Sequence, residues 1–144
     1  MTRPMAIFLL LFTLFISACK STATSTPAKE VVGKQVSVSG GSYTDVSVAE
    51  LQTMLANKDF TFVNVHIPFE GDIAGTDLSI AYNEIEQNLD MLPAEKDARI
   101  VLYCRSDRMS RIAAETLLGL GYTNIWNLDG GMVAWEQAGL PLEK

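Results

Sequence analysis

The 144-residue chain is poor in the side chains that bind metals: it has two cysteines, Cys19 and Cys104, and a single histidine, His66. Zinc sites need three or four such ligands in a cluster, and this sequence offers none. No internal repeat is evident. Gly130 and Gly131 lack the surrounding glycine spacing of a phosphate-binding loop, so we expect a tight turn there. The sequence therefore predicts neither a metal nor a cofactor, and we expect His66 to belong to a loop rather than to catalysis.

Basic residues are also few, with 11 Lys and Arg against 17 Asp and Glu and a formal net charge of −6. Phosphate backbones and anionic lipid headgroups repel such a chain. The charge balance thus argues against nucleic acid as a partner and against electrostatic binding to a membrane. The length is typical of one domain.

The longest apolar run lies near the N-terminus, from Met5 to Ile16, and follows the positive charge of Arg3. A helix that crosses a bilayer needs about 20 apolar residues, so this run is short for a membrane span. Its length and its flanks are typical of the core of a secretory signal peptide. An uncleaved membrane anchor is the less favoured alternative.

The segment Ile16-Ser17-Ala18-Cys19 resembles the lipobox of bacterial lipoproteins. The resemblance implies that residues 1–18 are a signal peptide and that Cys19 becomes an acylated N-terminus, anchored by its acyl chains. Removal of residues 1–18 leaves 10 basic and 17 acidic residues, a formal charge of −7, so attachment would depend on the lipid. Lys20 after the cysteine implies the periplasmic face of an outer membrane, or the outer face of the plasma membrane where no outer membrane exists.

Residues 19–42 contain few large apolar side chains and predict a flexible linker, followed by a folded domain over residues 43–144. Ser47 and Glu50 have the spacing of a helix capping box. Short apolar strands are predicted near 60–65, 99–103 and 124–128, and helical patterns near 47–55, 83–92, 113–120 and 133–137. This alternation predicts an α/β domain with a mainly parallel central sheet flanked by helices.

The loop of residues 104–111 reads C-R-S-D-R-M-S-R and follows a predicted buried strand. Ligands of parallel sheets bind at this end of the strands. Cysteine reacts as a thiolate, which nearby cations and helix N-termini favour, and loop amides can form an anion-binding nest. Arg105, Arg108 and Arg111 supply the cations, and a helix that begins near Ser110 supplies the N-terminus.

With Cys19 acylated, Cys104 would be a lone thiol in an oxidising compartment, which suggests that it is used. The simpler alternatives are a buried cysteine that acts as a small hydrophobic residue, and arginines that only pair with surface acids. The predicted site consists of a catalytic Cys104 and an anion-binding loop formed by Arg105, Ser106, Asp107, Arg108, Met109 and Ser110.

Three motifs resemble the rhodanese homology domain, and the resemblance covers almost all of residues 45–144. Tyr103-Cys104-Arg105-Ser106 resembles the family's Y-C-R-S-G, residues 70–76 (EGDIAGT) resemble E-G-H-I-P-G-A, and residues 128–135 (LDGGMVAW) with 138–143 (AGLPLE) resemble its usual ending. The resemblance implies a sulfurtransferase. Cys104 would take a sulfane sulfur from thiosulfate or another small donor, hold it as a persulfide and pass it to a thiol or cyanide acceptor.

The sequence departs from the family's active-site loop and from its D-V-R element at four positions. Asp107 stands at the usual glycine, Met109 at the usual arginine or threonine, and Asn64 and His66 replace the Asp and Arg of D-V-R. We expect Asp107 to add a negative charge beside an anion site and Met109 to remove a donor, for which Arg108 can compensate from the neighbouring position. These changes favour a lower activity with thiosulfate or a different sulfur source.

Two other functions use a related architecture. Cysteine phosphatases and arsenate reductases place an arginine six residues after the nucleophile, where this chain has Ser110, with Arg111 one residue later. That mismatch disfavours phosphatase chemistry. The remaining alternative is a domain without turnover: a persulfide carrier, a redox sensor or an interaction module.

Overall fold

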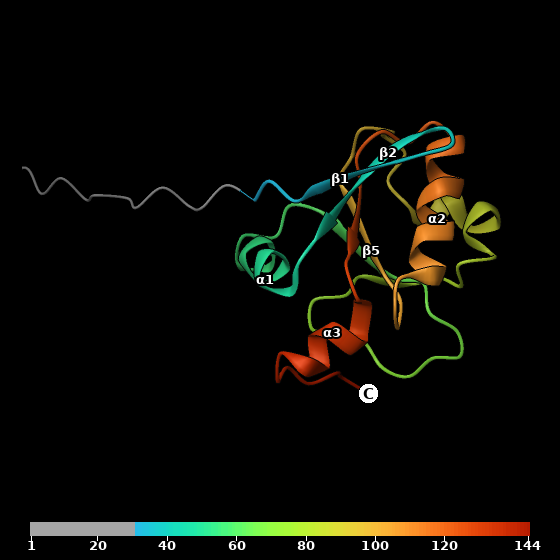
Figure 1. The fold of residues 1–144 in the computed structure, drawn as a ribbon. Helices are drawn as coiled ribbons and strands as arrows, with labels where there is room; N and C mark the ends of the chain where they lie inside the picture. Colours follow the sequence, from blue (N-terminus) through green and yellow to red (C-terminus); the bar gives the residue numbers. More distant parts are fainter. Residues whose placement is uncertain (1–30) are drawn as a thin grey trace, which may run out of the picture.

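The computed structural model describes residues 31–144, so the predicted signal peptide, Cys19 and the first part of the predicted linker lie outside the described residues. Six strands form one sheet in the order β1-β2-β6-β5-β3-β4 (Figure 1). Only β1 and β2 pair antiparallel; the other neighbouring strands are parallel. The predicted, mainly parallel α/β fold is confirmed. The strands are β1 (Lys34–Val38), β2 (Gly41–Val46), β3 (Thr61–Asn64), β4 (Leu78–Ser79), β5 (Ile100–Tyr103) and β6 (Ile125–Leu128).

The sheet begins earlier in the chain than the sequence predicts. Residues 34–42, assigned to the linker, form β1 and the start of β2, with Lys34 opposite Asp45 and Val38 opposite Gly41. Val36 and Val38 pack against the core, while the residues between them are polar. A short edge strand of this composition carries little hydrophobic signal, because solvent covers its other face.

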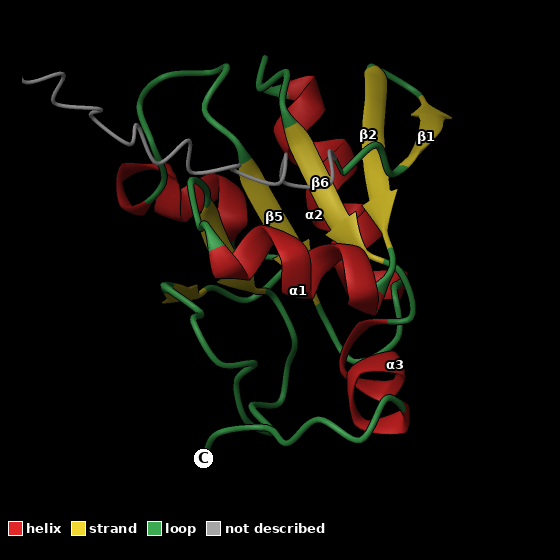
Figure 2. Ribbon diagram, turned by 90° about the vertical axis from the view of Figure 1, so that its left-hand side faces the viewer, coloured by secondary structure: helices red, strands yellow, loops and turns green. Residues whose placement is uncertain are grey.

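Helices cover both faces of the sheet (Figures 1 and 2). α1 (Val48–Ala56) and α3 (Gly131–Gln137) pack on one face, and α2 (Arg108–Gly119) and the 3-10 helix η1 (Ile85–Met91) pack on the other. The predicted capping box is present: the Ser47 hydroxyl accepts from the Glu50 amide, and the Glu50 carboxylate accepts from the Ser47 amide at 2.9 Å. Among residues 31–144, no helix is both long and apolar enough to cross a bilayer.

The central strand β5 is completely buried, and its side chains alternate between the two helical layers. Ile100 and Leu102 belong to the core beneath α2, whereas Val101 and Tyr103 belong to the core beneath α1 and α3. Each is 0% exposed, as expected for a parallel strand covered on both faces. The chain that leaves β5 is therefore anchored from both sides immediately before Cys104.

The hydroxyl of Tyr103 also ties β5 to the loop after β3. It accepts a hydrogen bond from the Ile73 amide at 3.0 Å, lies 2.7 Å from the Thr76 hydroxyl and donates to Asp72 at 3.1 Å. Burial raises the pKa of this phenol, so it stays protonated and able to donate. The loops that follow two adjacent parallel strands are thus held to each other.

Candidate active site

Cys104 is a free thiol directly after β5 and is 2% exposed. It lies in the wall of a pocket of about 210 Å³. The pocket is at the carboxyl ends of parallel strands, where α/β folds bind ligands. The residues that line it are His66, Cys104, Arg105, Ser106, Arg108 and Met109.

The side chain of Ser110 lies within hydrogen-bond distance of the thiol. It is fully buried in the first turn of α2, and its hydroxyl oxygen lies 3.5 Å from the Cys104 sulfur. The hydroxyl also donates to the main-chain carbonyl of Asp107 at 3.0 Å. A hydroxyl has one proton and two lone pairs, so it can accept from a thiol or turn its proton toward a thiolate. Ser110 suits both protonation states of the sulfur.

The loop leaves several main-chain amides without a partner. Within the described part of the chain, the N–H groups of Arg105, Ser106, Asp107 and Met109 donate to no acceptor. The loop closes instead through the Arg108 amide, which donates to the Ser106 carbonyl at 3.1 Å. Free amides of successive residues before a helix are the elements of an anion-binding nest.

Two of the three loop arginines line the pocket. Arg105 is held by carboxylates, at 2.6 Å from Glu70 and 3.9 Å from Glu136. Arg108 is exposed and forms no ion pair with any residue from 31 to 144. Its guanidinium is therefore the charge in the pocket that remains free for an anionic group.

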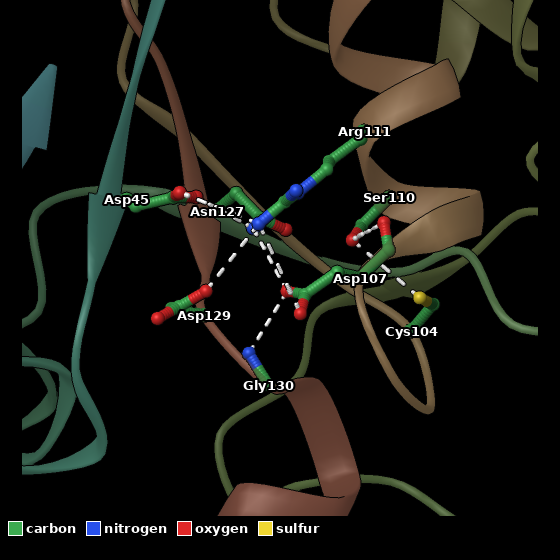
Figure 3. Close-up of polar contacts among 8 residues, drawn as sticks. All are labelled: Asp45, Cys104, Asp107, Ser110, Arg111, Asn127, Asp129 and Gly130. Atoms are coloured by element: carbon green, nitrogen blue, oxygen red, sulfur yellow. Dashed lines mark hydrogen bonds and ion pairs between the residues drawn. The ribbon is translucent and has the colours of Figure 1, made fainter. Parts of the chain in front are cut away.

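The third arginine points elsewhere, which differs from the predicted arrangement. The Arg111 guanidinium lies 3.5 Å from Asp129, 3.7 Å from Asp45 and 4.0 Å from Asp107 (Figure 3). Burial lowers the pKa of Arg111, but Tyr43 and the carboxylates outweigh that effect and raise it. Arg111 does not line the thiol pocket, so it does not clamp an oxyanion as the arginine of a cysteine phosphatase does.

Beneath this arginine, two buried residues link neighbouring strands to the loop. The Asn127 amide on β6 donates to the carboxylate of Asp45 on β2 at 2.8 Å and to that of Asp107 at 3.4 Å. Burial raises the pKa of Asp45, while the hydrogen bond from Asn127 and the charge of Arg111 oppose this rise. Asn127 and Arg111 therefore join the sheet to the start of α2.

Asp107 differs from its predicted role. It has a positive φ of 77° at the N-cap of α2, and its carboxylate accepts from the Gly130 amide at 2.8 Å. The side chain does not line the pocket; it faces Gly130, Asn127 and Arg111 (Figure 3). The expected negative charge beside the anion site is thus turned away and compensated by Arg111.

The predicted tight turn at Gly130 and Gly131 packs directly against the backbone of the loop that follows Cys104. A side chain on Gly131 would collide with the main-chain carbonyl oxygens of Cys104 and Arg105. Those carbonyls accept hydrogen bonds from Met132 at 2.9 Å and from Val133 at 3.0 Å. The first turn of α3 therefore fixes the backbone that presents the thiol.

His66 lines the thiol pocket, and Glu70 pairs with Arg105 beside it, although the sequence predicted neither position. His66 follows β3, the parallel neighbour of β5, so its side chain reaches the same pocket as Cys104. The sequence contained the signal, a histidine at a predicted strand end, but it does not show which strands are adjacent. Residues 31–144 contain no group of three or more His, Cys, Asp or Glu residues placed to bind a metal ion.

We expect the hydrogen bond between Asp107 and Gly130 to stabilise the domain. Replacing Asp107 with Gly should lower the free energy of unfolding by about 1–2 kcal/mol, because a charged acceptor is lost. Asp107→Ala should cost about 1 kcal/mol more, because alanine is strained at positive φ. Urea unfolding measures both values, and equal stabilities for the two variants would show that the left-handed conformation is not retained.

Two known proteins are similar to this chain in sequence. A sulfurtransferase of Allochromatium vinosum is 32% identical over 94 residues, which cover 63% of this chain and 85% of that protein. An uncharacterized protein of Synechocystis is 34% identical over 105 residues, 70% of this chain, and the match spans 58% of that longer protein.

A solved structure shows the same fold. The rhodanese-related protein from Thermoplasma volcanium has a TM-score of 0.57 and 30% identity, covering 68% of this chain and 95% of its own. The Rhodanese-like domain family matches residues 47–138, which include β3, β5, the thiol loop and the glycine turn. The motifs, the fold and these relatives together show that the chain belongs to the rhodanese-like domain family.

Proposed function

We propose that the protein is a sulfurtransferase in which Cys104 takes a sulfane sulfur as a persulfide and passes it to a thiophilic acceptor, a thiol or cyanide. The observation that carries the proposal is a free thiol in a pocket that also offers unpaired loop amides and the unpaired guanidinium of Arg108. The named sulfurtransferase among its relatives supports the same reaction class.

The proposed cycle has two displacements at sulfur. The Cys104 thiolate attacks the outer sulfur of the donor; a new S–S bond forms, and the remainder of the donor leaves with the electron pair of the broken bond. The acceptor then attacks the outer sulfur of the persulfide, and Cys104 leaves as a thiolate. Each step replaces one bond to sulfur by another, so the cycle needs no external oxidant or reductant.

The loop amides and Arg108 support the proposal because the Cys104 thiolate, the ionised persulfide and anionic donors carry negative charge. A thiolate, a terminal persulfide and thiosulfate all accept hydrogen bonds from amides and guanidinium groups. Met109 contributes an apolar wall where the family often has another donor. The pocket therefore suits singly charged sulfane donors better than the dianion thiosulfate.

Replacing Cys104 with Ser should abolish sulfur transfer, because an alcohol forms no persulfide, while the free energy of unfolding should change by less than about 1 kcal/mol. Mass spectrometry after exposure to polysulfide, thiosulfate or glutathione persulfide detects sulfur added to Cys104. A Cys19→Ser protein serves as the control and should still load.

Retained transfer in Cys104→Ser would refute the mechanism. Loading without discharge to any acceptor would instead identify a carrier or a sensor.

Replacing Arg108 with Ala should slow loading from thiosulfate about tenfold, because the variant loses a charge-assisted contact to the anion. Stopped-flow measurement of persulfide formation tests this. Arg99→Gln is the matched control: Arg99 lies at the opposite end of β5, where it pairs with Asp59 at 3.0 Å. Equal rates in the wild type and Arg108→Ala would remove Arg108 from the site.

We further propose that Cys19 is acylated and tethers the domain to the cell envelope. The lipobox resemblance supports this, as does the acidic charge, which makes electrostatic membrane binding unfavourable. In a bacterial host, Cys19→Ser should lose incorporation of labelled palmitate and retain its signal peptide. Ala18→Ser, a small-residue change at the same site, is the control, and unchanged lipid labelling of Cys19→Ser would exclude this anchor.

A further inference from the structure

Among the residues that line the thiol pocket, His66 is buried with ring nitrogens that have no hydrogen-bond partner in the described part of the chain. It follows β3, and its main-chain amide donates to the Asn64 side chain at 2.9 Å, which fixes the backbone at this point. Its side chain is only 8% exposed and forms part of the pocket wall together with Cys104, Arg105 and Arg108.

Both ring nitrogens of His66 are buried, and neither has a hydrogen-bond partner among residues 31–144. The nearest charge to Nε2 is the Glu70 carboxylate at 3.4 Å, a separation within ion-pair range but without the alignment of a hydrogen bond. Buried polar atoms in folded proteins are nearly always paired. An imidazole kept unpaired beside a nucleophilic thiol therefore points to a partner that enters the pocket.

We infer that His66 exchanges protons with thiol-type substrates at Cys104, and this inference rests on the sulfurtransferase function proposed above. Imidazole is the side chain best suited to accept and return a proton near neutral pH. The charged and titratable groups beside it are Glu70, Cys104, Arg105 and Arg108. The Glu70 carboxylate lies 3.4 Å from His66 Nε2 and is itself held by Arg105 through its other oxygen at 2.6 Å.

In the loading step, the Cys104 thiolate attacks the outer sulfur of a donor persulfide, R–S–SH. The S–S bond of the donor breaks, and R–S⁻ leaves with the electron pair and takes a proton from the His66 imidazolium. The products are Cys104–S–SH, R–SH and neutral His66. This step consumes one proton of the histidine and involves no net oxidation.

In the discharge step, neutral His66 removes the proton of the acceptor thiol R′–SH. The resulting R′–S⁻ attacks the outer sulfur of Cys104–S–SH, the S–S bond to Cys104 breaks, and Cys104 leaves as a thiolate. The product is R′–S–SH, and His66 is again protonated. One proton thus shuttles on His66 through each complete cycle.

This mechanism distinguishes substrates by their need for a proton. A thiol is mostly protonated near neutral pH, and therefore benefits from a base. Thiosulfate releases sulfite as an anion, and sulfite attacks the persulfide through its own lone pair, so the thiosulfate and sulfite couple requires no proton on the histidine. Replacing His66 should therefore slow the thiol reactions more than the reactions of this couple.

The test is single-turnover kinetics of His66→Asn and His66→Gln in the full-length protein, both in a Cys19→Ser background so that Cys104 is the only thiol. Loading from glutathione persulfide and discharge to glutathione should each slow by about tenfold or more. Loading from thiosulfate and discharge to sulfite should slow several-fold less than the two thiol reactions, because neither step needs a proton on the histidine. In the variants, discharge to glutathione should also rise steeply with pH as free thiolate becomes available, whereas the parent profile is flatter.

Equal losses for both pairs of substrates would overturn the inference and identify His66 as a structural residue, and unchanged rates would overturn it as well. Failure of every donor to load Cys104 in the parent would instead refute the sulfurtransferase function itself. A second measurement needs no variant: His66 is the only histidine, so its NMR ring signals are unambiguous. They should shift when Cys104 is loaded, and unchanged signals would overturn the inference.

Discussion

The structure of the site depends on the close approach of Gly131 to the backbone of Cys104 and Arg105. No other residue fits at that position, because even a methyl group would meet two carbonyl oxygens. The contact lets the first turn of α3 donate two hydrogen bonds to those carbonyls. Because α3 supplies the donors for both carbonyls, these bonds use none of the loop's own amides, which remain available to a ligand. The same two bonds restrict the movement of the backbone that carries the Cys104 sulfur.

The charge cluster around Arg111 also fixes the position of the glycine turn relative to the loop. The Asp107 carboxylate accepts a hydrogen bond from the main-chain amide of Gly130. The Asn127 side chain donates to Asp107 and to Asp45, and Arg111 lies close enough to both carboxylates to neutralise them (Figure 3). An aspartate at positive φ is strained, but unlike glycine it supplies an acceptor for the turn. A carboxylate at this position is therefore compatible with a neighbouring anion site, because its charge is bound by the Gly130 amide and Arg111.

The sequence predicted the fold and the position of the thiol, because both depend on local patterns. The strand before Cys104, the capping box at Ser47 and the glycine turn are all local features, and the structure has them. The directions of long side chains were not predictable. Arg111 lies within seven residues of Cys104 but reaches β2 and β6, since its direction is set by acids distant in the chain.

The departures from the family pattern at Asn64 and Asp72 compensate for each other, because the two side chains are in contact in the structure. Asn64, at the family's usual aspartate, donates to Asp72, which stands at the family's usual histidine, at 2.9 Å. An aspartate at 64 would face a second carboxylate at this distance, whereas the amide of Asn64 donates to Asp72 and accepts from the His66 main chain. The exchange keeps the loop in place, so these two changes preserve the architecture rather than weaken it.

The remaining departures act together on the chemistry. His66 and Met109 replace residues that are usually cationic or polar, so the pocket has one unpaired guanidinium, on Arg108, an apolar thioether and an imidazole without a hydrogen-bond partner among the described residues. We expect a pocket of this composition to bind a dianion such as thiosulfate more weakly than a pocket with several fixed donors would. Each missing donor removes a charge-assisted hydrogen bond to the dianion. A thiol or a persulfide carries at most one charge and offers a proton that imidazole can exchange. We therefore propose that the same two substitutions favour sulfur transfer between thiols over transfer from a doubly charged donor.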